Sequence, residues 1–177
     1  MELVEPTVEY KDSFIEAVKE FRKDEDYTYR NKWYRSLSIP ELEADFERFV
    51  EMQRSRARGE NLPEGYVPGS EFWLVDGGEF IGRATVRHRL NEKLIKVGGH
   101  VGFDVRPSKR GRGYGKGILK LALEKAKELG ITNVLVTCDI RNEASRKIIE
   151  HSGGVFQDQI HNPEMGSDAR RYWIDIK

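Results

Sequence analysis

Residues 101–117 read VGFDVRPSKRGRGYGKG, and this stretch decides the fold. An apolar strand pattern runs into four alternating glycines, which directly precede a helical pattern. A helix start exposes unpaired backbone N–H groups and a partial positive charge. Glycine removes side chains that would keep a ligand away from the backbone. The stretch therefore predicts an anion site suited to a phosphate or pyrophosphate. Four basic residues add charge around it: Lys109, Arg110, Arg112 and Lys116.

A plain basic turn between a strand and a helix is the simpler interpretation. A single tight turn seldom needs four alternating glycines, which favours the anion site. Two nucleotide motifs fit poorly. In the nucleotide P-loop, Gly-Lys is followed by Ser or Thr, whereas Lys116 is followed by Gly117 and the upstream glycine position holds Arg110. The dinucleotide fingerprint, begun at Gly111, needs glycine where Lys116 stands.

The first seventy residues predict mainly helices. Residues 2–8 predict a strand that Pro6 interrupts, so we expect it at the sheet edge. Helices are predicted over 11–22 and from near Pro40 to about Gly59. Between them, aromatic residues gather beside acidic ones, and they either wall an acceptor pocket or pack between the two helices. The aromatic residues are Tyr27, Tyr29, Trp33 and Tyr34, and the acidic ones are Asp24, Glu25 and Asp26.

From residue 70 onward strands and helices alternate. Asp76-Gly77-Gly78 predicts the turn of a hairpin whose second strand runs to Arg89. The remaining pattern predicts a strand over 97–105, a helix over 113–129, a buried parallel strand over 133–138, a helix over 143–151, and strands near 154–161 and 171–176. This order predicts one domain over 1–177, of the α/β class (α+β type) with a mixed sheet.

Composition excludes several classes of protein. Thirty basic residues balance thirty acidic ones, so we expect neither nucleic acid nor an anionic membrane as partner. No segment approaches the roughly 20 apolar residues that span a bilayer. Cys138 is the one cysteine, which excludes an internal disulfide, and the four histidines lack zinc-like spacing, so no metal is expected. We expect a cytoplasmic protein.

The spacing Arg110-x-x-Gly113-x-Gly115 resembles the Q/R-x-x-G-x-G/A motif of the GNAT superfamily of acyl-CoA N-acyltransferases. The preceding residues 101–107 look like that family's fourth strand. Asn142-Glu143-Ala144-Ser145, followed by Gly153-Gly154, is similar to its later N-x-x-S…G segment. The resemblance covers roughly residues 70–177 well and the first seventy only by helix count. Residues 87–91 and 98–100 look like an uncharacterised bacterial branch of predicted acetyltransferases.

The resemblance implies a GNAT-like fold: a mixed, mostly antiparallel twisted sheet with helices on both faces, in which the fourth and fifth strands splay apart around coenzyme A. It implies acetyl-CoA as the acyl donor. The motif's Arg110 and the backbone of Gly111, Arg112, Gly113, Tyr114, Gly115 and Lys116 would hold its pyrophosphate. The backbone of Phe103, Asp104 and Val105 would pair with the pantetheine, and a backbone N–H near Phe103 would meet the oxyanion. Asn142 and Ser145 would line the thiol end. Asn142 also fits a helix N-cap, and the two roles are compatible.

His100 stands where many family members have a glutamate, ten residues before the motif's Arg110. A lysine-like amine has a pKa near 10.4, so only about one molecule in 10³ is neutral at pH 7. A general base or a desolvated pocket must supply the neutral amine, and a histidine suits the first role. The other interpretation is a core histidine held by a backbone hydrogen bond.

Ile149 stands where the family often has a tyrosine that protonates the leaving thiolate. That acid is therefore missing here, or it is supplied by another residue or by water. The predicted function is acetyl transfer from acetyl-CoA to a primary amine of a small molecule or protein, by direct attack in a ternary complex. A longer acyl donor, a coenzyme-A-binding regulatory module without catalysis, and a dinucleotide-binding protein are the alternatives. A homodimer is common for folds of this type.

Overall fold

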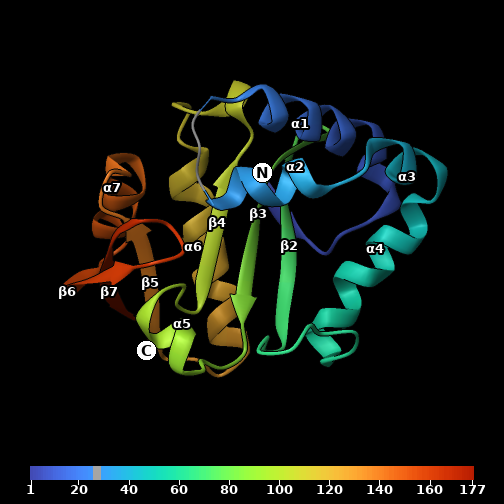
Figure 1. Ribbon diagram of the computed structural model, residues 1–177. Coiled ribbons are helices and arrows are strands. Elements are labelled where there is room, and N and C mark those ends of the chain that lie inside the picture. The colour runs from blue at the N-terminus through green and yellow to red at the C-terminus, as the bar shows by residue number, and fades with distance from the viewer. Residues whose placement is uncertain (26–28) are drawn as a thin grey trace.

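The computed structural model describes residues 1–25 and 29–177, and only the backbone of Tyr29 and Arg30. One seven-stranded sheet runs in the order β1-β2-β3-β4-β5-β7-β6. The pair β4 and β5 is parallel, and the other five neighbouring pairs are antiparallel. Helices cover both faces of the sheet (Figure 1). The mixed, mostly antiparallel architecture predicted from the sequence is confirmed.

The strands are β1 (Glu2–Val4), β2 (Gly69–Asp76), β3 (Glu79–Arg87), β4 (Val101–Val105), β5 (Asn133–Asp139), β6 (Val155–Asn162) and β7 (Ser167–Asp175). The helices are α1 (Lys11–Lys23), α2 (Tyr29–Ser36), α3 (Ile39–Ala44), α4 (Phe46–Ser55), α5 (Glu92–Lys96), α6 (Tyr114–Glu128) and α7 (Glu143–His151). Short 3₁₀ turns span Val8–Tyr10, Arg56–Arg58 and Pro107–Lys109.

The face covered by α1–α4 carries an aromatic core. Phe14 of α1 stacks on Trp73 of β2, with ring centroids 4.8 Å apart. Tyr34 of α2 is fully buried and stacks on Phe21 at 3.7 Å. Trp33 and Tyr34 therefore pack, as one of the two interpretations expects for this group. Asp26 and Tyr27 of that group lie outside the described residues.

The opposite face is covered by α6 and α7 and is mainly aliphatic. In Figure 1, α6 lies behind the sheet and α7 lies beside β5. Ile118, Ala122 and Ala126 of α6 are fully buried, as their helical spacing predicts, whereas Leu129 at the end of the same pattern is exposed. Val134 and Val136 of β5 are buried in the same cluster. The expectation of a buried strand with a parallel neighbour is confirmed for β5.

Several element boundaries differ from the sequence expectation. The helix expected from Pro40 to Gly59 is broken at Asp45, which ends α3 and whose carboxylate accepts the Arg48 N–H as the N-cap of α4. The strand expected over 97–105 begins only at Val101, because α5 and a turn occupy the residues before it. The first strand ends at Val4, before Pro6, and lies at the sheet edge as expected. Helix α2 was not predicted from the sequence.

Candidate active site

The glycine turn lies between β4 and α6, and it is open. Gly111 has φ +74° and Gly113 has φ +86°, a left-handed backbone that favours glycine. A Cβ built on either residue would meet nothing within 4 Å. Protein atoms therefore do not fill the space in front of these residues. Because the first N–H groups of a helix have no partner within the helix, this space suits an anion.

The two later glycines of the turn serve packing instead. A Cβ on Gly115 would come within 2.6 Å of Ile148 Cδ1 of α7, and one on Gly117 would meet Met1 Cε at 2.5 Å. Gly115 thus allows α6 and α7 to approach each other. The four alternating glycines have two different physical causes, which the spacing alone does not separate.

Two of the four basic residues of the turn form ion pairs within the protein, and the other two are exposed to solvent. Lys109 Nζ lies 2.5 Å from Glu79 Oε2, and Arg110 forms an ion pair of 2.8 Å with Asp24. Arg110 Nε also donates to the Val105 carbonyl at 3.2 Å. Arg112 and Lys116 are exposed, and within residues 1–25 and 29–177 no carboxylate pairs with them. The charge offered to an anion is therefore smaller than the four basic residues indicate.

Strands β4 and β5 form a wedge that opens toward the glycine turn. They pair at one register position, Val101 with Val136. Beyond it β4 continues along β3, to Val105 opposite Gly82, and β5 continues along β7, to Asp139 opposite Ala169. Each side of the wedge is therefore held by its outer neighbour. The splayed strand pair that the resemblance implies is present in the backbone.

The alternation of β4 decides which main-chain groups face this wedge. Arg106 N–H donates to Ile81 O on β3 at 2.8 Å, and the register is continuous. Hydrogen-bonded pairs alternate in an antiparallel ladder, so the main chain of Asp104 faces β3. The main-chain N–H and C=O groups of Phe103 and Val105 therefore face the wedge. Asp104 therefore leaves the set expected to pair with pantetheine, whereas Phe103 and Val105 stay in it.

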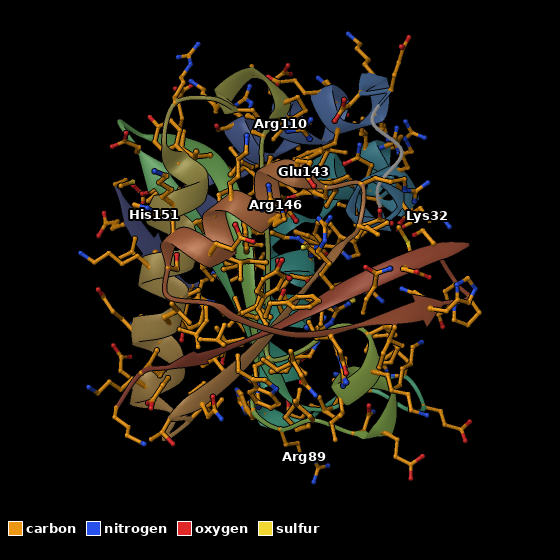
Figure 2. The ribbon with its side chains drawn as sticks, turned by 90° about the vertical axis from the view of Figure 1, so that its left-hand side faces the viewer. Lys32, Arg89, Arg110, Glu143, Arg146 and His151 are labelled. Atoms are coloured by element: carbon orange, nitrogen blue, oxygen red, sulfur yellow. The ribbon has the colours of Figure 1, made fainter. Side chains whose placement is uncertain are left out.

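The start of α7 lies across the wedge from β4. Asn142 Oδ1 accepts the Ser145 N–H at 2.9 Å, so Asn142 is the N-cap of α7. Arg146, one residue on, pairs with Glu143 and Glu150 along the helix surface. Figure 2 labels Arg146 and Glu143 on α7. Ile149 is fully buried in the aliphatic core. The position for which the family resemblance implies a tyrosine therefore contributes packing in this chain.

A buried charged network, missed from the sequence, lies on the α2 side of β2, β3 and β4. Arg83 Nε donates to Asp104 Oδ2 at 3.0 Å, and its Nη1 donates to Glu71 Oε2 at 3.2 Å. The other oxygens accept from Tyr34 Oη at 2.6 Å and from Trp73 Nε1 at 3.2 Å. All four carboxylate oxygens are thus satisfied. The only sequence signal was Arg83 among the apolar residues at the middle of β3.

This network fixes α2 over β4. The Arg83 guanidinium lies 3.5 Å from the centre of a Trp33 ring, a cation–π contact. Burial works to lower the pKa of Arg83, but Glu71 and Asp104 outweigh it and raise that pKa. Burial and the nearby Asp104 charge raise the pKa of Tyr34 well above 10.0. Arg83 therefore stays charged, and the Tyr34 hydroxyl stays protonated and donates.

His100 lies at the narrow end of the wedge, half-buried, immediately before β4. The ring Nδ1 of His100 accepts the Leu135 N–H at 2.9 Å, and the backbone N–H of His100 donates to Leu135 O at 2.7 Å. Burial, and less strongly the Arg87 charge, lower the pKa of His100. The backbone-held histidine expected by one interpretation is present. Its role as a general base stays a prediction.

Acid should weaken the fold through His100. The folded pKa lies below the unfolded value of about 6.5, so the unfolded chain binds more protons as pH falls below that value. The stabilising effect is complete above about pH 6.5 and is lost as pH falls through the folded pKa. We expect the free energy of unfolding in urea to fall between about pH 7.5 and about pH 5.5. His100→Asn should lose less over this interval. Equal losses in both proteins would contradict the assignment.

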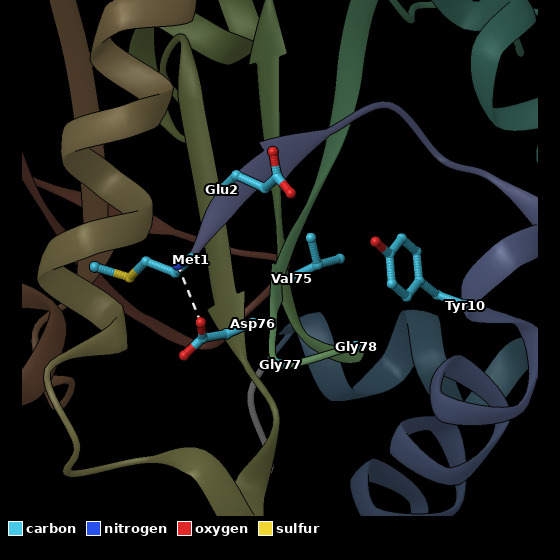
Figure 3. A pocket seen from close by; sticks show the side chains of 7 residues that line it. All are labelled: Met1, Glu2, Tyr10, Val75, Asp76, Gly77 and Gly78. Atoms are coloured by element: carbon cyan, nitrogen blue, oxygen red, sulfur yellow. Dashed lines mark ion pairs between the residues drawn. The ribbon is translucent and has the colours of Figure 1, made fainter.

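Two shallow hollows are lined by residues outside the glycine turn. One, of about 280 Å³, is lined by Met1, Glu2, Tyr10 and the turn at 75–78 (Figure 3). In it the Met1 amine pairs with Asp76 at 3.0 Å, and Asp76 also accepts from Tyr114 of α6 at 2.8 Å.

Among the described residues, no group of three His, Cys, Asp or Glu side chains could hold a metal ion. None of the described helices is long and apolar enough to cross a membrane.

Comparison with known families decides the relationship. The model of the acetyltransferase (GNAT) domain matches residues 3–155. The chain belongs to the GNAT acetyltransferase domain family. The match includes the first seventy residues, where the sequence resemblance rested on helix count alone. No curated protein gave a match.

Solved structures of GNAT acetyltransferases share the fold at low sequence identity. Microcin C7 self-immunity acetyltransferase MccE, in complex with acetyl-CoA and AMP, has a TM-score of 0.70 at 11% identity, covering 98% of this chain and 91% of that one. The ribosomal L7/L12 alpha-N-protein acetyltransferase RimL, in complex with coenzyme A, has a TM-score of 0.72 at 14% identity, with coverages of 98% and 93%. A GNAT-family acetyltransferase from Streptococcus pneumoniae has a TM-score of 0.65 at 16% identity, with coverages of 99% and 98%.

Proposed function

We propose that this chain transfers an acyl group, acetyl in the first place, from acyl-coenzyme A to a primary amine by direct attack in a ternary complex. The observation that carries the proposal is the open glycine turn at the start of α6, placed at the mouth of the β4–β5 wedge. The similar structures of MccE and RimL hold acetyl-CoA or coenzyme A. The acceptor of this chain is a separate question, because its identity to both is below 25%.

The donor site is assigned residue by residue. The backbone N–H groups of residues 111–115 would hold the pyrophosphate, with Arg112 and Lys116 adding charge from solvent. The Lys116 N–H leaves the expected set because it donates to Gly113 O at 3.1 Å. Arg110, tied to Asp24 and to Val105 O, would fix the shape of the turn. The main chain of Phe103 and Val105 would pair with the pantetheine arm. Asn142 and Ser145 would border the thiol end. The thioester supplies an activated carbonyl carbon for the amine to attack.

Proton transfer is the less defined part of the reaction. A neutral amine requires either a base, for which His100 is the candidate, or a site that disfavours the charged form. With Ile149 in the core, no tyrosine from that position of α7 protonates the thiolate, which leaves water or another donor. A backbone N–H near Phe103 remains the candidate for the oxyanion.

We also propose a single domain over 1–177, a cytoplasmic location and a homodimer.

Release of free thiol from acetyl-CoA, measured with a panel of amines, tests this function. We expect turnover that requires both an amine and acetyl-CoA, with slower turnover for longer acyl chains. Binding of coenzyme A without turnover for any amine would favour the regulatory module. Tighter binding of NAD or ATP than of acetyl-CoA in calorimetry would overturn the donor assignment. Because RimL is an alpha-N-protein acetyltransferase, peptides with a free N-terminal amine are the first members of the panel.

A further inference from the structure

The segment Gly98-Gly99-His100 joins α5 to β4 and runs beside β5 at Leu135. Both main-chain polar groups of Leu135 form hydrogen bonds with His100. The Leu135 carbonyl accepts the backbone N–H of His100, and the Leu135 N–H donates to the ring Nδ1 of His100. In a regular parallel ladder, the N–H of Leu135 would donate to a carbonyl of the neighbouring strand. Here an imidazole nitrogen takes the place of that carbonyl.

The neighbouring carbonyls are engaged elsewhere. Arg87 N–H donates to His100 O at 2.8 Å. Arg87 Nη1 donates to Gly98 O at 3.2 Å and to Gly99 O at 2.9 Å. All three carbonyls therefore already accept a hydrogen bond from Arg87 of β3. Without the His100 ring, the Leu135 N–H would be left without an acceptor at a buried position, and an unsatisfied buried donor destabilises a fold.

The approach of this segment to β5 is close. A Cβ on Gly99, which has φ +65°, would lie 2.4 Å from Leu135 O. Gly98 N–H donates to Thr137 Oγ1, two residues further along β5, at 3.0 Å. The contacts of residues 98–100 thus join β4 to β5 just before the single register pair of Val101 with Val136. Beyond that pair the strands diverge.

We propose that His100 is a positioning residue whose Nδ1 closes the narrow end of the β4–β5 wedge and so sets the angle at which the two strands hold the pantetheine arm. This inference rests on the proposed function for the identity of the ligand. A backbone N–H can only donate, so Nδ1 carries the lone pair and Nε2 carries the hydrogen. The neutral ring has no second lone pair. A general-base role would require the bond to Leu135 to break.

Three variants separate positioning from base catalysis. Asparagine places an acceptor oxygen at the position of Nδ1 but has no basic group, whereas glutamine places its amide one bond further and alanine has no acceptor. We expect His100→Asn to keep kcat/KM for acetyl-CoA within about threefold, and His100→Gln and His100→Ala to lose about tenfold or more. An asparagine variant as inactive as the alanine variant would overturn the proposal. His88→Asn, which changes another half-buried histidine, one bonded to Ser70 Oγ, is the matched control.

Amide hydrogen exchange tests the same contact without acyl transfer. In the wild-type protein and in His100→Asn, the Leu135 amide should exchange slowly. In His100→Ala it should exchange at least about tenfold faster, while the Tyr172 amide of β7 stays protected and shows that the sheet is folded. Slow exchange of Leu135 in His100→Ala would overturn the proposal. If no amine supports turnover, the proposed function fails, and this measurement still decides the role of His100.

Discussion

Gly113→Glu should abolish measurable acetyl-CoA binding, with the dissociation constant rising by about 100-fold or more. The space in front of Gly113 is open, so a side chain added there points into the site and not into the core. Placing a carboxylate against a pyrophosphate sets like charges together at a cost of several kcal/mol, and each 1.4 kcal/mol is a factor of ten. Isothermal titration calorimetry with acetyl-CoA measures the change directly.

Backbone strain must be separated from this charge effect, because Gly113 has φ +86°. Gly130, just after the end of α6, provides the control: it has φ +77°, and a Cβ there also meets nothing within 4 Å. Gly130→Glu carries the same charge and a similar strain at the opposite end of the same helix. We expect both variants to melt at similarly reduced temperatures and only Gly113→Glu to lose acetyl-CoA binding. Equal affinity in the two variants would remove the pyrophosphate from this turn.

The glycine turn could be read from the sequence because its physics is local. The positive φ values of Gly111 and Gly113 and the adjacent helix start all lie within residues 111–114, whereas the packing of Gly115 and Gly117 involves distant residues. The strand–turn–helix order around it, and the edge strand ending before Pro6, are also consequences of nearby residues. These features needed no knowledge of what the segment contacts.

Contacts between distant elements could not be read in the same way. Arg110 pairs with Asp24 at the end of α1, and the hydroxyl of Tyr34 meets Asp104 seventy positions away. The sequence pattern predicts that Arg110 binds the ligand, whereas in the structure its ion pair with Asp24 joins α1 to the turn. The same limit explains His100: its place before β4 was evident, but the Leu135 amide that occupies Nδ1 is contributed by β5. The sequence identifies such a residue by its position, and the tertiary structure shows which groups it contacts.

Helix α2 shows why a polar segment escapes prediction. Most of its residues are charged or aromatic, with little apolar periodicity to mark a helix. Its stability comes from the stacking of Tyr34 on Phe21 and from the contact of Trp33 with Arg83. Both partners lie in other elements, so the helix depends on tertiary packing more than on its own propensity.

That dependence makes Arg83→Met the second large effect, here on stability. Arg83 is the shared partner of Glu71 and Asp104, whose side chains are 4% and 8% exposed. Removing the guanidinium leaves two buried carboxylates without their cation and removes the surface on which Trp33 lies. Breaking a buried ion pair in this way costs about 3–5 kcal/mol. Urea unfolding at neutral pH, with the Arg83→Met and wild-type midpoints compared at equal slope, measures this loss.

The chain contains a matched exposed arrangement. Arg58 bridges Glu51 and Glu60 with the same one-to-two stoichiometry, but all three side chains are about half exposed. Arg58→Met should change the unfolding free energy far less than Arg83→Met, since water solvates the remaining carboxylates. A second substitution tests the cause: Asp104→Asn in the Arg83→Met background should recover part of the lost stability, because it removes one of the two uncompensated charges. If the double variant is less stable than Arg83→Met, the loss comes from packing against Trp33, and the network does not hold α2 through its charges.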